Sequence, residues 1–163
     1  MFLLLLSPVA ITAPTQLPAW VQTAWQQADL ERTYVCSTYL QPSILQADFN
    51  GDGKLDVAIP VARRASSSRG LVIFHQGQSK PFILGMSGKI GAELPGASFD
   101  WASQWKLYTK RTTFEVTTDR NGDISGTRPI KLHYPAIEFK SDESGGGLLY
   151  WTGRTYRWLY QSC

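Results

Sequence analysis

Residues 148–159, with the sequence LLYWTGRTYRWL, decide the fold that we expect for this chain. Two runs of aromatic and aliphatic residues flank Gly153-Arg154, and a two-residue loop with glycine first is typical of a type II′ β-hairpin. We interpret the aromatic face of this hairpin as sheet core, with a face that binds sugar or peptide as the alternative. The register that the turn implies puts four large side chains on this face: Leu149 opposite Trp158, and Trp151 opposite Tyr156.

Other segments carry the apolar or alternating pattern of short β-strands, separated by polar turns. Asn121-Gly122 is a turn signal of the kind that joins two strands of a hairpin. We predict strands at residues 55–61, 71–75, 81–84, 112–118 and 136–139.

The beginning of the domain has a helical pattern instead. Residues 18–28 repeat apolar side chains at intervals of three and four, with Pro18 near the first turn. Trp20, Ala24 and Ala28 share one stripe of this helix. We therefore predict an α+β fold that is mainly antiparallel β, with one N-terminal amphipathic helix packed on a sheet of hairpins.

Length and composition place the chain among single-domain globular proteins. Of its 163 residues, 43% are hydrophobic, which is enough for a core, and the net charge is only +3. Because the basic residues are scattered, we expect no nucleic-acid partner and no attachment to a membrane surface. We expect residues 18–163 to form one β-rich domain, and we expect the protein to be a monomer.

The first thirteen residues resemble a secretory signal. An apolar run at residues 2–6 is followed by small residues that end at Ala13, although no Lys or Arg precedes the run. This run is too short to cross a bilayer as a helix, so we expect no stable membrane insertion. We interpret residues 1–13 as the remnant of a signal peptide and expect a secreted or periplasmic protein.

Two cysteines fit an exported protein. Cys36 and Cys163 are the only cysteines of the chain, and such a pair in an oxidising compartment usually forms a disulfide. We predict a Cys36–Cys163 disulfide, with two free buried thiols as the alternative.

Residues 48–56, DFNGDGKLD, have the spacing of a calcium loop. Side-chain oxygens recur at every second position, a glycine is sixth, and the seventh residue of such a loop donates its backbone carbonyl. Three carboxylates in so short a loop repel one another, and a bound cation neutralises them. We predict a structural Ca²⁺ site, with a solvated acidic turn as the alternative; its ligands are Asp48, Asn50, Asp52, Lys54 and Asp56.

This loop departs from an EF-hand, because Ile59 stands at the twelfth position and the flanks are strand-like. It resembles instead the calcium loops of FG-GAP and VCBS-type repeats, as in the β-propellers of integrin α-chains, which carry D-x-[DN]-x-D-G-x-x-D between strands. The resemblance implies a calcium site that orders two neighbouring strands. It covers one copy of about a dozen residues, whereas a propeller repeats its unit several times, so we expect no propeller.

A partial second copy follows at residues 119–123, DRNGD. Ile124 replaces the glycine and Thr127 replaces the last Asp of the loop. We interpret this segment as a polar hairpin turn rather than as a second metal site, with a degenerate metal site left open.

No catalytic signature is present in the sequence. His75 and His133 stand alone, outside any zinc-binding spacing. We therefore expect an exported, calcium-stabilised, non-enzymatic domain that binds a protein or a glycan, as an inhibitor or immunity-type protein does. The alternative is a small secreted hydrolase, which would require His75 or His133 to meet carboxylates in a pocket.

Overall fold

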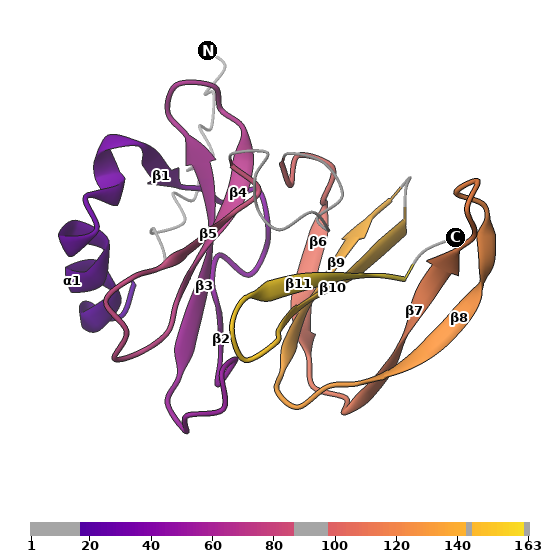
Figure 1. Cartoon of the computed structure of the whole chain (residues 1–163). Coiled ribbons are helices and arrows are strands. Elements are labelled where there is room, and N and C mark those ends of the chain that lie inside the picture. The colour runs from indigo at the N-terminus through magenta and orange to yellow at the C-terminus, as the bar shows by residue number, and fades with distance from the viewer. Residues whose placement is uncertain (1–16, 87–97, 143–144, 162–163) are drawn as a thin grey trace, which may run out of the picture.

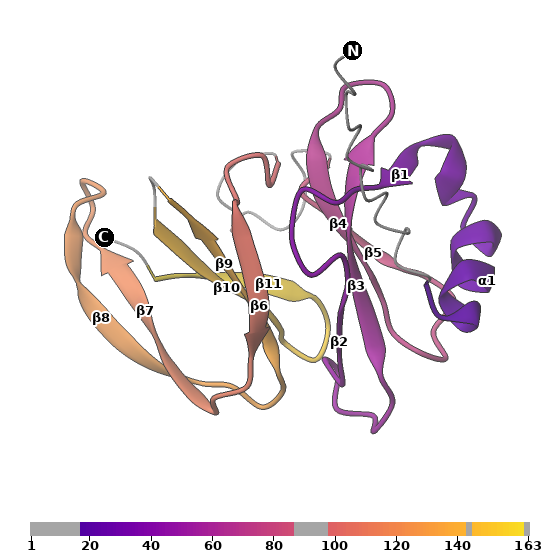
Figure 2. The ribbon, with the colours of Figure 1, turned by 180° about the vertical axis from the view of Figure 1, so that it is seen from behind.

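The computed structural model of the chain describes residues 17–86, 98–142 and 145–161 (Figure 1). Two antiparallel sheets lie side by side, and a two-stranded ribbon stands beyond the second one, as the views from both sides agree (Figure 2). The mainly antiparallel β fold with one N-terminal helix is confirmed. The predicted signal segment, residues 1–13, lies outside the described residues.

The first sheet is built around the long strand β3, with β4 on one side of it and both β1 and β2 on the other. Its order is β1-β3-β4-β5, with β2 beside the first half of β3. The strands are β1 (Tyr34–Cys36), β2 (Leu45–Ala47), β3 (Asp56–Arg63), β4 (Arg69–Phe74) and β5 (Phe82–Leu84).

The second sheet has the order β11-β10-β9-β6, and the ribbon consists of β7 and β8. Every pairing in both sheets and in the ribbon is antiparallel. The strands of the second sheet are β6 (Gln104–Tyr108), β9 (Ala136–Ser141), β10 (Gly145–Trp151) and β11 (Tyr156–Tyr160); those of the ribbon are β7 (Thr112–Thr118) and β8 (Ile124–Lys131).

The helix α1 (Ala19–Gln27) covers the outer face of the first sheet, and the short 3₁₀ helix η1 (Leu30–Arg32) follows it. Val21 is fully buried in the cluster that α1 shares with this sheet. Partly buried side chains at intervals of three and four extend the contact: Trp20, Ala24, Trp25 and Ala28. The predicted amphipathic helix and the sheet beneath it are therefore confirmed.

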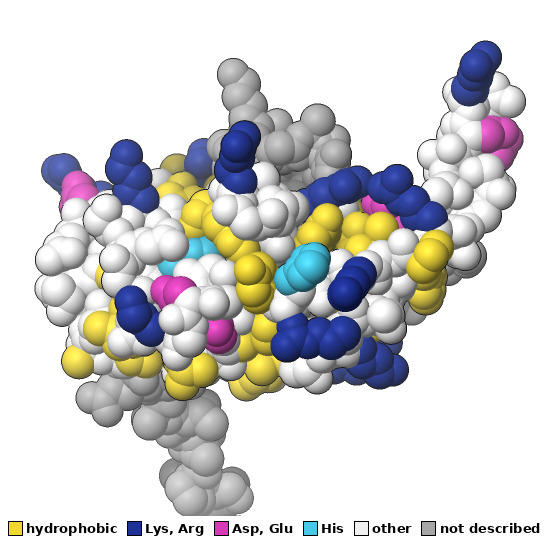
Figure 3. Space-filling model, turned by 60° about the horizontal axis from the view of Figure 1, so that its bottom comes forward, with side chains coloured by type: hydrophobic (Ala, Val, Ile, Leu, Met, Phe, Trp, Pro, Cys, Tyr) yellow, Lys and Arg dark blue, Asp and Glu magenta, His cyan; other side chains and the backbone are white. Residues whose placement is uncertain are grey.

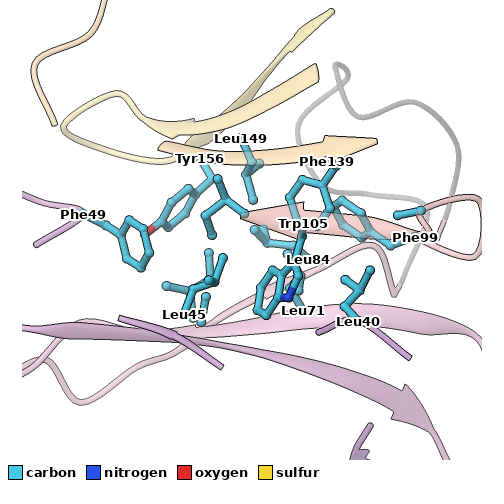
Figure 4. Close-up of a cluster of buried hydrophobic side chains, with 14 of the residues drawn as sticks. Leu40, Leu45, Phe49, Leu71, Leu84, Phe99, Trp105, Phe139, Leu149 and Tyr156 are labelled. Atoms are coloured by element: carbon cyan, nitrogen blue, oxygen red, sulfur yellow. The ribbon is translucent and has the colours of Figure 1, made fainter. Parts of the chain in front are cut away.

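The main core lies between the two sheets, where side chains of both point toward one another (Figure 4). The second sheet contributes the aromatic hairpin, whose observed register pairs Trp151 with Tyr156 and Leu149 with Trp158. Gly153 has φ = +94° and Arg154 does not share its positive φ, as a type II′ turn requires. The register and the interpretation of the aromatic face as core are both confirmed.

The ribbon leaves the second sheet after β6 and returns to it before β9 (Figure 1). A small apolar cluster on the outer face of the second sheet supports its base, and contains Leu132, Ala136, Leu148 and Leu159. Within the described residues, no helix is long and apolar enough to cross a membrane.

Candidate metal centre

The predicted calcium loop connects β2 to β3, and Asp48 organises its first half. The Asp48 carboxylate accepts hydrogen bonds from the backbone N–H groups of Gly51 at 2.6 Å, Asp52 at 3.1 Å and Gly53 at 2.9 Å. Gly51 and Gly53 have φ near +80°, a conformation that glycine adopts without strain. The side chain at the first position thus curls the loop upon itself.

The next two polar positions continue this pattern. Asn50 Oδ1 accepts the N–H of Asp52 at 2.9 Å, and Asp52 Oδ1 accepts the N–H of Lys54 at 2.9 Å. The Lys54 ammonium lies 3.9 Å from Asp52 Oδ2, an exposed ion pair that solvent screens. The Lys54 side chain therefore gives the loop little charge compensation.

Asp56 lies at the other end of the loop, at the start of β3, and is fully buried with 0% exposure. One carboxylate oxygen accepts the N–H of Phe49 and the other accepts the N–H of Gln76, both at 2.9 Å. Burial raises the pKa of this carboxyl to about 6, although the two N–H groups oppose the shift. The Asp56 carboxylate joins the loop to the chain that leaves β4.

His75 is the basic residue that faces Asp56, with Nε2 at 4.0 Å from its carboxylate. His75 is 1% exposed, and burial lowers its pKa, which favours the uncharged imidazole. Its Nε2 forms a 2.7 Å hydrogen bond with the hydroxyl of Tyr156, and Phe82 and Trp151 pack around the ring. The buried Asp56 charge is therefore left without a cationic side chain to neutralise it among the described residues.

His75 thus meets a carboxylate, but inside the core rather than at an accessible surface. Tyr156, the third member of this polar cluster, is only 5% exposed. His133 is exposed, on the connection between β8 and β9. The structure does not bring His133 into the cluster of His75, Asp56 and Tyr156.

Two residues of the loop anchor it to the rest of the molecule. Phe49 is fully buried between the two sheets, where Figure 4 shows its ring near Tyr156. Gly51 lies against the ring of Tyr134, so closely that a Cβ atom on Gly51 would overlap the ring. Tyr134 lies on the connection between β8 and β9, so the loop contacts the segment that leads into the second sheet.

The donor set of the loop has the chemistry that Ca²⁺ prefers, since all five predicted ligands offer oxygen. An oxygen that accepts one N–H keeps a second lone pair for an ion, as Asp48 Oδ2 does, whereas Asp48 Oδ1 already accepts two N–H groups. The described residues contain no group of three or more His, Cys, Asp or Glu side chains arranged to hold a metal. The oxygens of Asp48, Asn50 and Asp52 face loop N–H groups, and both oxygens of Asp56 accept backbone N–H groups.

The segment at residues 119–123 forms the exposed turn between β7 and β8. Asp119 Oδ1 accepts the N–H groups of Asn121 at 2.8 Å and Asp123 at 3.0 Å, and the N–H of Asp119 donates to the carbonyl of Asp123. The interpretation of this segment as a polar hairpin turn is confirmed.

The predicted disulfide involves one described residue. Cys36 is exposed on β1 and forms no disulfide with a described residue. Cys163 lies outside the described residues, so the Cys36–Cys163 pairing stays a prediction.

Sequence reasoning did not identify the residues that anchor the loop, namely Phe49, Gln76, Tyr134 and Tyr156. The one available signal was Phe49, which is apolar, as Leu55 is, in a loop whose other side chains are polar or absent. Comparisons of the chain with protein-family models, with curated proteins and with solved structures found no match. The resemblance of the loop to FG-GAP and VCBS-type repeats therefore stays a prediction.

Proposed function

We propose that this protein is an exported, calcium-stabilised, non-enzymatic β domain that binds a protein or glycan partner, as inhibitor and immunity-type proteins do. The observation that carries the calcium part is the fully buried Asp56 carboxylate, which lies 4.0 Å from a buried His75 whose pKa is lowered by burial. A buried carboxylate is costly unless a positive charge compensates it. A calcium ion in the adjoining loop supplies that charge.

The side chains of Asp48, Asn50, Asp52 and Asp56 and the carbonyl of Lys54 would hold the ion. The role that follows is structural, because the loop contacts the core between the sheets through Phe49 and the segment that leads into the second sheet through Tyr134. An ion that binds the folded chain and not the unfolded chain raises the free energy of unfolding. Calcium would thus stabilise the junction of the two sheets.

The position of His75 supports a binding domain over a hydrolase. A general base must reach a proton of the substrate within hydrogen-bond distance. His75, Asp56 and Tyr156 are buried, and none of them lines either of the two cavities described for the chain. Asp56 lies at the end of the loop, His75 follows β4 and Tyr156 begins β11, so the contacts among them hold three parts of the fold together. This is a structural role.

Isothermal titration calorimetry with Ca²⁺ tests the proposed site on the whole chain, after treatment with chelator. We expect saturable binding to the parent protein, with affinity lowered at least about tenfold in Asp52→Ala, because one ligand is lost. Asp123→Ala is the matched control, since Asp123 has the equivalent place in the turn between β7 and β8 and should leave the affinity unchanged. Absence of binding, or an equal loss in both variants, would refute the proposed calcium site.

Export is tested separately. The whole chain, expressed with its first residues, should be recovered outside the cytoplasm with a shortened N-terminus, as peptide mass spectrometry can show. Recovery of the chain in the cytoplasm with residues 1–13 retained would contradict export.

A further inference from the structure

A groove lies between the outer face of the second sheet and the ribbon. Its volume is ≈ 480 Å³, within the range of known ligand sites. Thr113 and Phe114 of β7 contribute to one wall, and the strands β9 and β10 form the floor. In Figure 1 the ribbon and the second sheet lie on its two sides.

The groove is closed on the side where the ribbon meets β11. There the side-chain amide of Gln161 donates to the hydroxyl of Thr113 and, at 3.0 Å, to the carbonyl of Phe114. The guanidinium of Arg157 on β11 lies 3.5 Å from the carboxylate of Glu115 on β7. These contacts hold β7 against β11 and exclude a further strand between them. The space beside them suits a small molecule instead.

The floor of the groove presents charged side chains and bare backbone. Ile137 and Phe139 of β9 are buried in the main core. Because side chains alternate along a strand, Glu138 and Lys140 point to the opposite face. A Cβ atom on Gly146 of β10 would overlap the carbonyl of Phe139, so the packing of the two strands requires this glycine. The choice of a ligand therefore depends on the side chains around the floor.

The side chains around the groove carry a net positive charge. Lys110, Lys140 and Glu138 line it, which gives two positive charges and one negative charge. Glu138 is already offset by Lys106, 2.9 Å away, and by Lys140, 3.6 Å away. Figure 3 shows Lys and Arg side chains gathered on the side of the molecule that carries the second sheet and the ribbon. Because Lys110 forms no ion pair among the described residues, its ammonium group is available to one anionic group of a ligand.

The walls combine hydrogen-bonding groups with an aromatic ring. The hydroxyl of Thr113 accepts the Gln161 amide and still has a proton to donate. The hydroxyl of Tyr108 donates to the carbonyl of Thr112 at 2.9 Å and can still accept. Phe114 adds a ring that is 45% exposed. Polar groups around an exposed aromatic ring match a sugar, which has hydroxyls at its rim and C–H groups that pack on the negative face of such a ring.

We propose that this groove binds an acidic sugar, a pyranose ring that carries a carboxylate. The carboxylate pairs with Lys110, the C–H face of the ring packs on Phe114, and the hydroxyls bond to Thr113 and Glu138. A neutral sugar would leave the charge of Lys110 unused, and a simple anion would leave the aromatic ring unused. This inference names the place and the chemical class of the glycan partner in the binding role proposed above, and in that respect rests on it.

An NMR titration tests the proposal with glucuronate, added to the whole isotope-labelled protein in saturating Ca²⁺. A ligand of this size should bind with a Kd of about 1 mM. We expect saturable shifts of the amide signals of Thr113 and Gly146, which line the groove, and none at Gly51 and Asp52 in the calcium loop. Absence of saturation up to about 10 mM, or shifts confined to the calcium loop, would overturn the proposal.

Two pairs of variants test the charge and the ring. Lys110→Glu should weaken binding at least about tenfold, because the carboxylate of the sugar then faces a like charge. Lys80→Glu makes the same change on the exposed turn between β4 and β5 and should leave the affinity within about twofold. Phe114→Ala should weaken binding at least about threefold, whereas Ile124→Ala, which removes another exposed apolar side chain of the ribbon, should leave it unchanged. An equal loss within either pair would overturn the proposal.

Two further probes separate a site for an acidic sugar from a simpler site. Glucose has a similar ring without the charge, and inorganic phosphate has the charge without the ring. We expect each of them to bind at least about tenfold more weakly than glucuronate. Equal affinity for glucose would show that the lysines take no part in binding, and equal affinity for phosphate would show a simple anion site; either result would overturn the proposal.

Failure of glucuronate to bind would leave the calcium site standing, because calorimetry tests that site independently.

Discussion

Residues 48–52 and 119–123 share four of their five residues, yet the structure uses them differently. Both read D-x-N-G-D, and in both the first Asp accepts backbone N–H groups of the turn that follows. The first segment is anchored in the core by Phe49 and Asp56, which are both 0% exposed. The second segment, with Arg120 and Thr127 at the equivalent positions, is an exposed hairpin turn.

The comparison shows which part of the motif does what. The shared residues specify a tight turn through local hydrogen bonds, since Asp and Asn side chains bond readily to the backbone that follows them. The differing residues decide whether the turn is held against a core. A calcium site needs both parts, because its ligands must be brought together and also kept in place.

The largest expected effect concerns the second position of each segment. Phe49→Ala removes a fully buried ring between the sheets and should lower the free energy of unfolding by about 3–5 kcal/mol. Arg120→Ala, at the equivalent exposed position, should change it by at most about 0.5 kcal/mol. Urea unfolding measures both, and a loss below about 1 kcal/mol for Phe49→Ala would show that the first segment is not anchored.

The second largest loss of unfolding free energy is expected at the ninth position, Asp56 in the first segment and Thr127 in the second. Asp56→Ala leaves the buried N–H groups of Phe49 and Gln76 without their acceptor and should cost about 2–4 kcal/mol. Thr127→Ala, the exposed counterpart on β8, should cost at most about 0.5 kcal/mol. Urea unfolding in chelator measures both losses of free energy. Similar losses in the two variants would show that the first segment is not held against the core more firmly than the second.

Substitution of the glycine at the fourth position should give a smaller difference in unfolding free energy between the two segments, and one that depends on a single contact. Gly51 and Gly122 have φ of +81° and +90°, so an added Cβ strains both backbones alike, but only Gly51 lies against another side chain, that of Tyr134. Gly51→Ala should therefore cost about 1–2 kcal/mol more than Gly122→Ala. In a Tyr134→Ala background this excess should disappear, as thermal melting of the double variant can show. An excess that survives Tyr134→Ala would place its cause elsewhere.

The smallest effect is expected at the fifth position without calcium. Asp52 and Asp123 are both exposed, so Asp52→Ala and Asp123→Ala in chelator should differ in unfolding free energy by at most about 0.5 kcal/mol. When calcium is added, the gap between the two variants should widen, because only Asp52 is a proposed ligand. If the two variants differ in unfolding free energy by the same amount with and without calcium, Asp52 is not a calcium ligand.

The strands and the aromatic hairpin could be predicted because their signals are local. The turn at Gly153 fixes the register of β10 and β11, and the predicted strand at residues 112–118 coincides with β7. The exposed strand β8 was missed because it lacks an alternating apolar pattern. β6 does alternate polar Gln104 and Lys106 with apolar Trp105 and Leu107, but it is not among the strands predicted from the sequence.

The candidate site was predictable only in part. The spacing of polar residues indicated where the loop lies, but the anchoring contacts join residues far apart in the sequence. His75 meets Tyr156 across 81 positions of the chain, and Gly51 meets Tyr134 only after the two sheets have packed together. No local pattern encodes such a contact, because it depends on how the sheets are placed relative to each other.

Amide hydrogen exchange by NMR, with Ca²⁺ and with chelator, tests the central claim most directly. The amides of Phe49 and Gln76 donate to Asp56, whereas those of Asn121 and Asp123 donate to Asp119. We predict that calcium slows exchange at Phe49 and Gln76 at least about tenfold and leaves Asn121 and Asp123 within about twofold. Unchanged exchange at Phe49 and Gln76, or equal slowing in both segments, would contradict a calcium ion that stabilises the loop of residues 48–56.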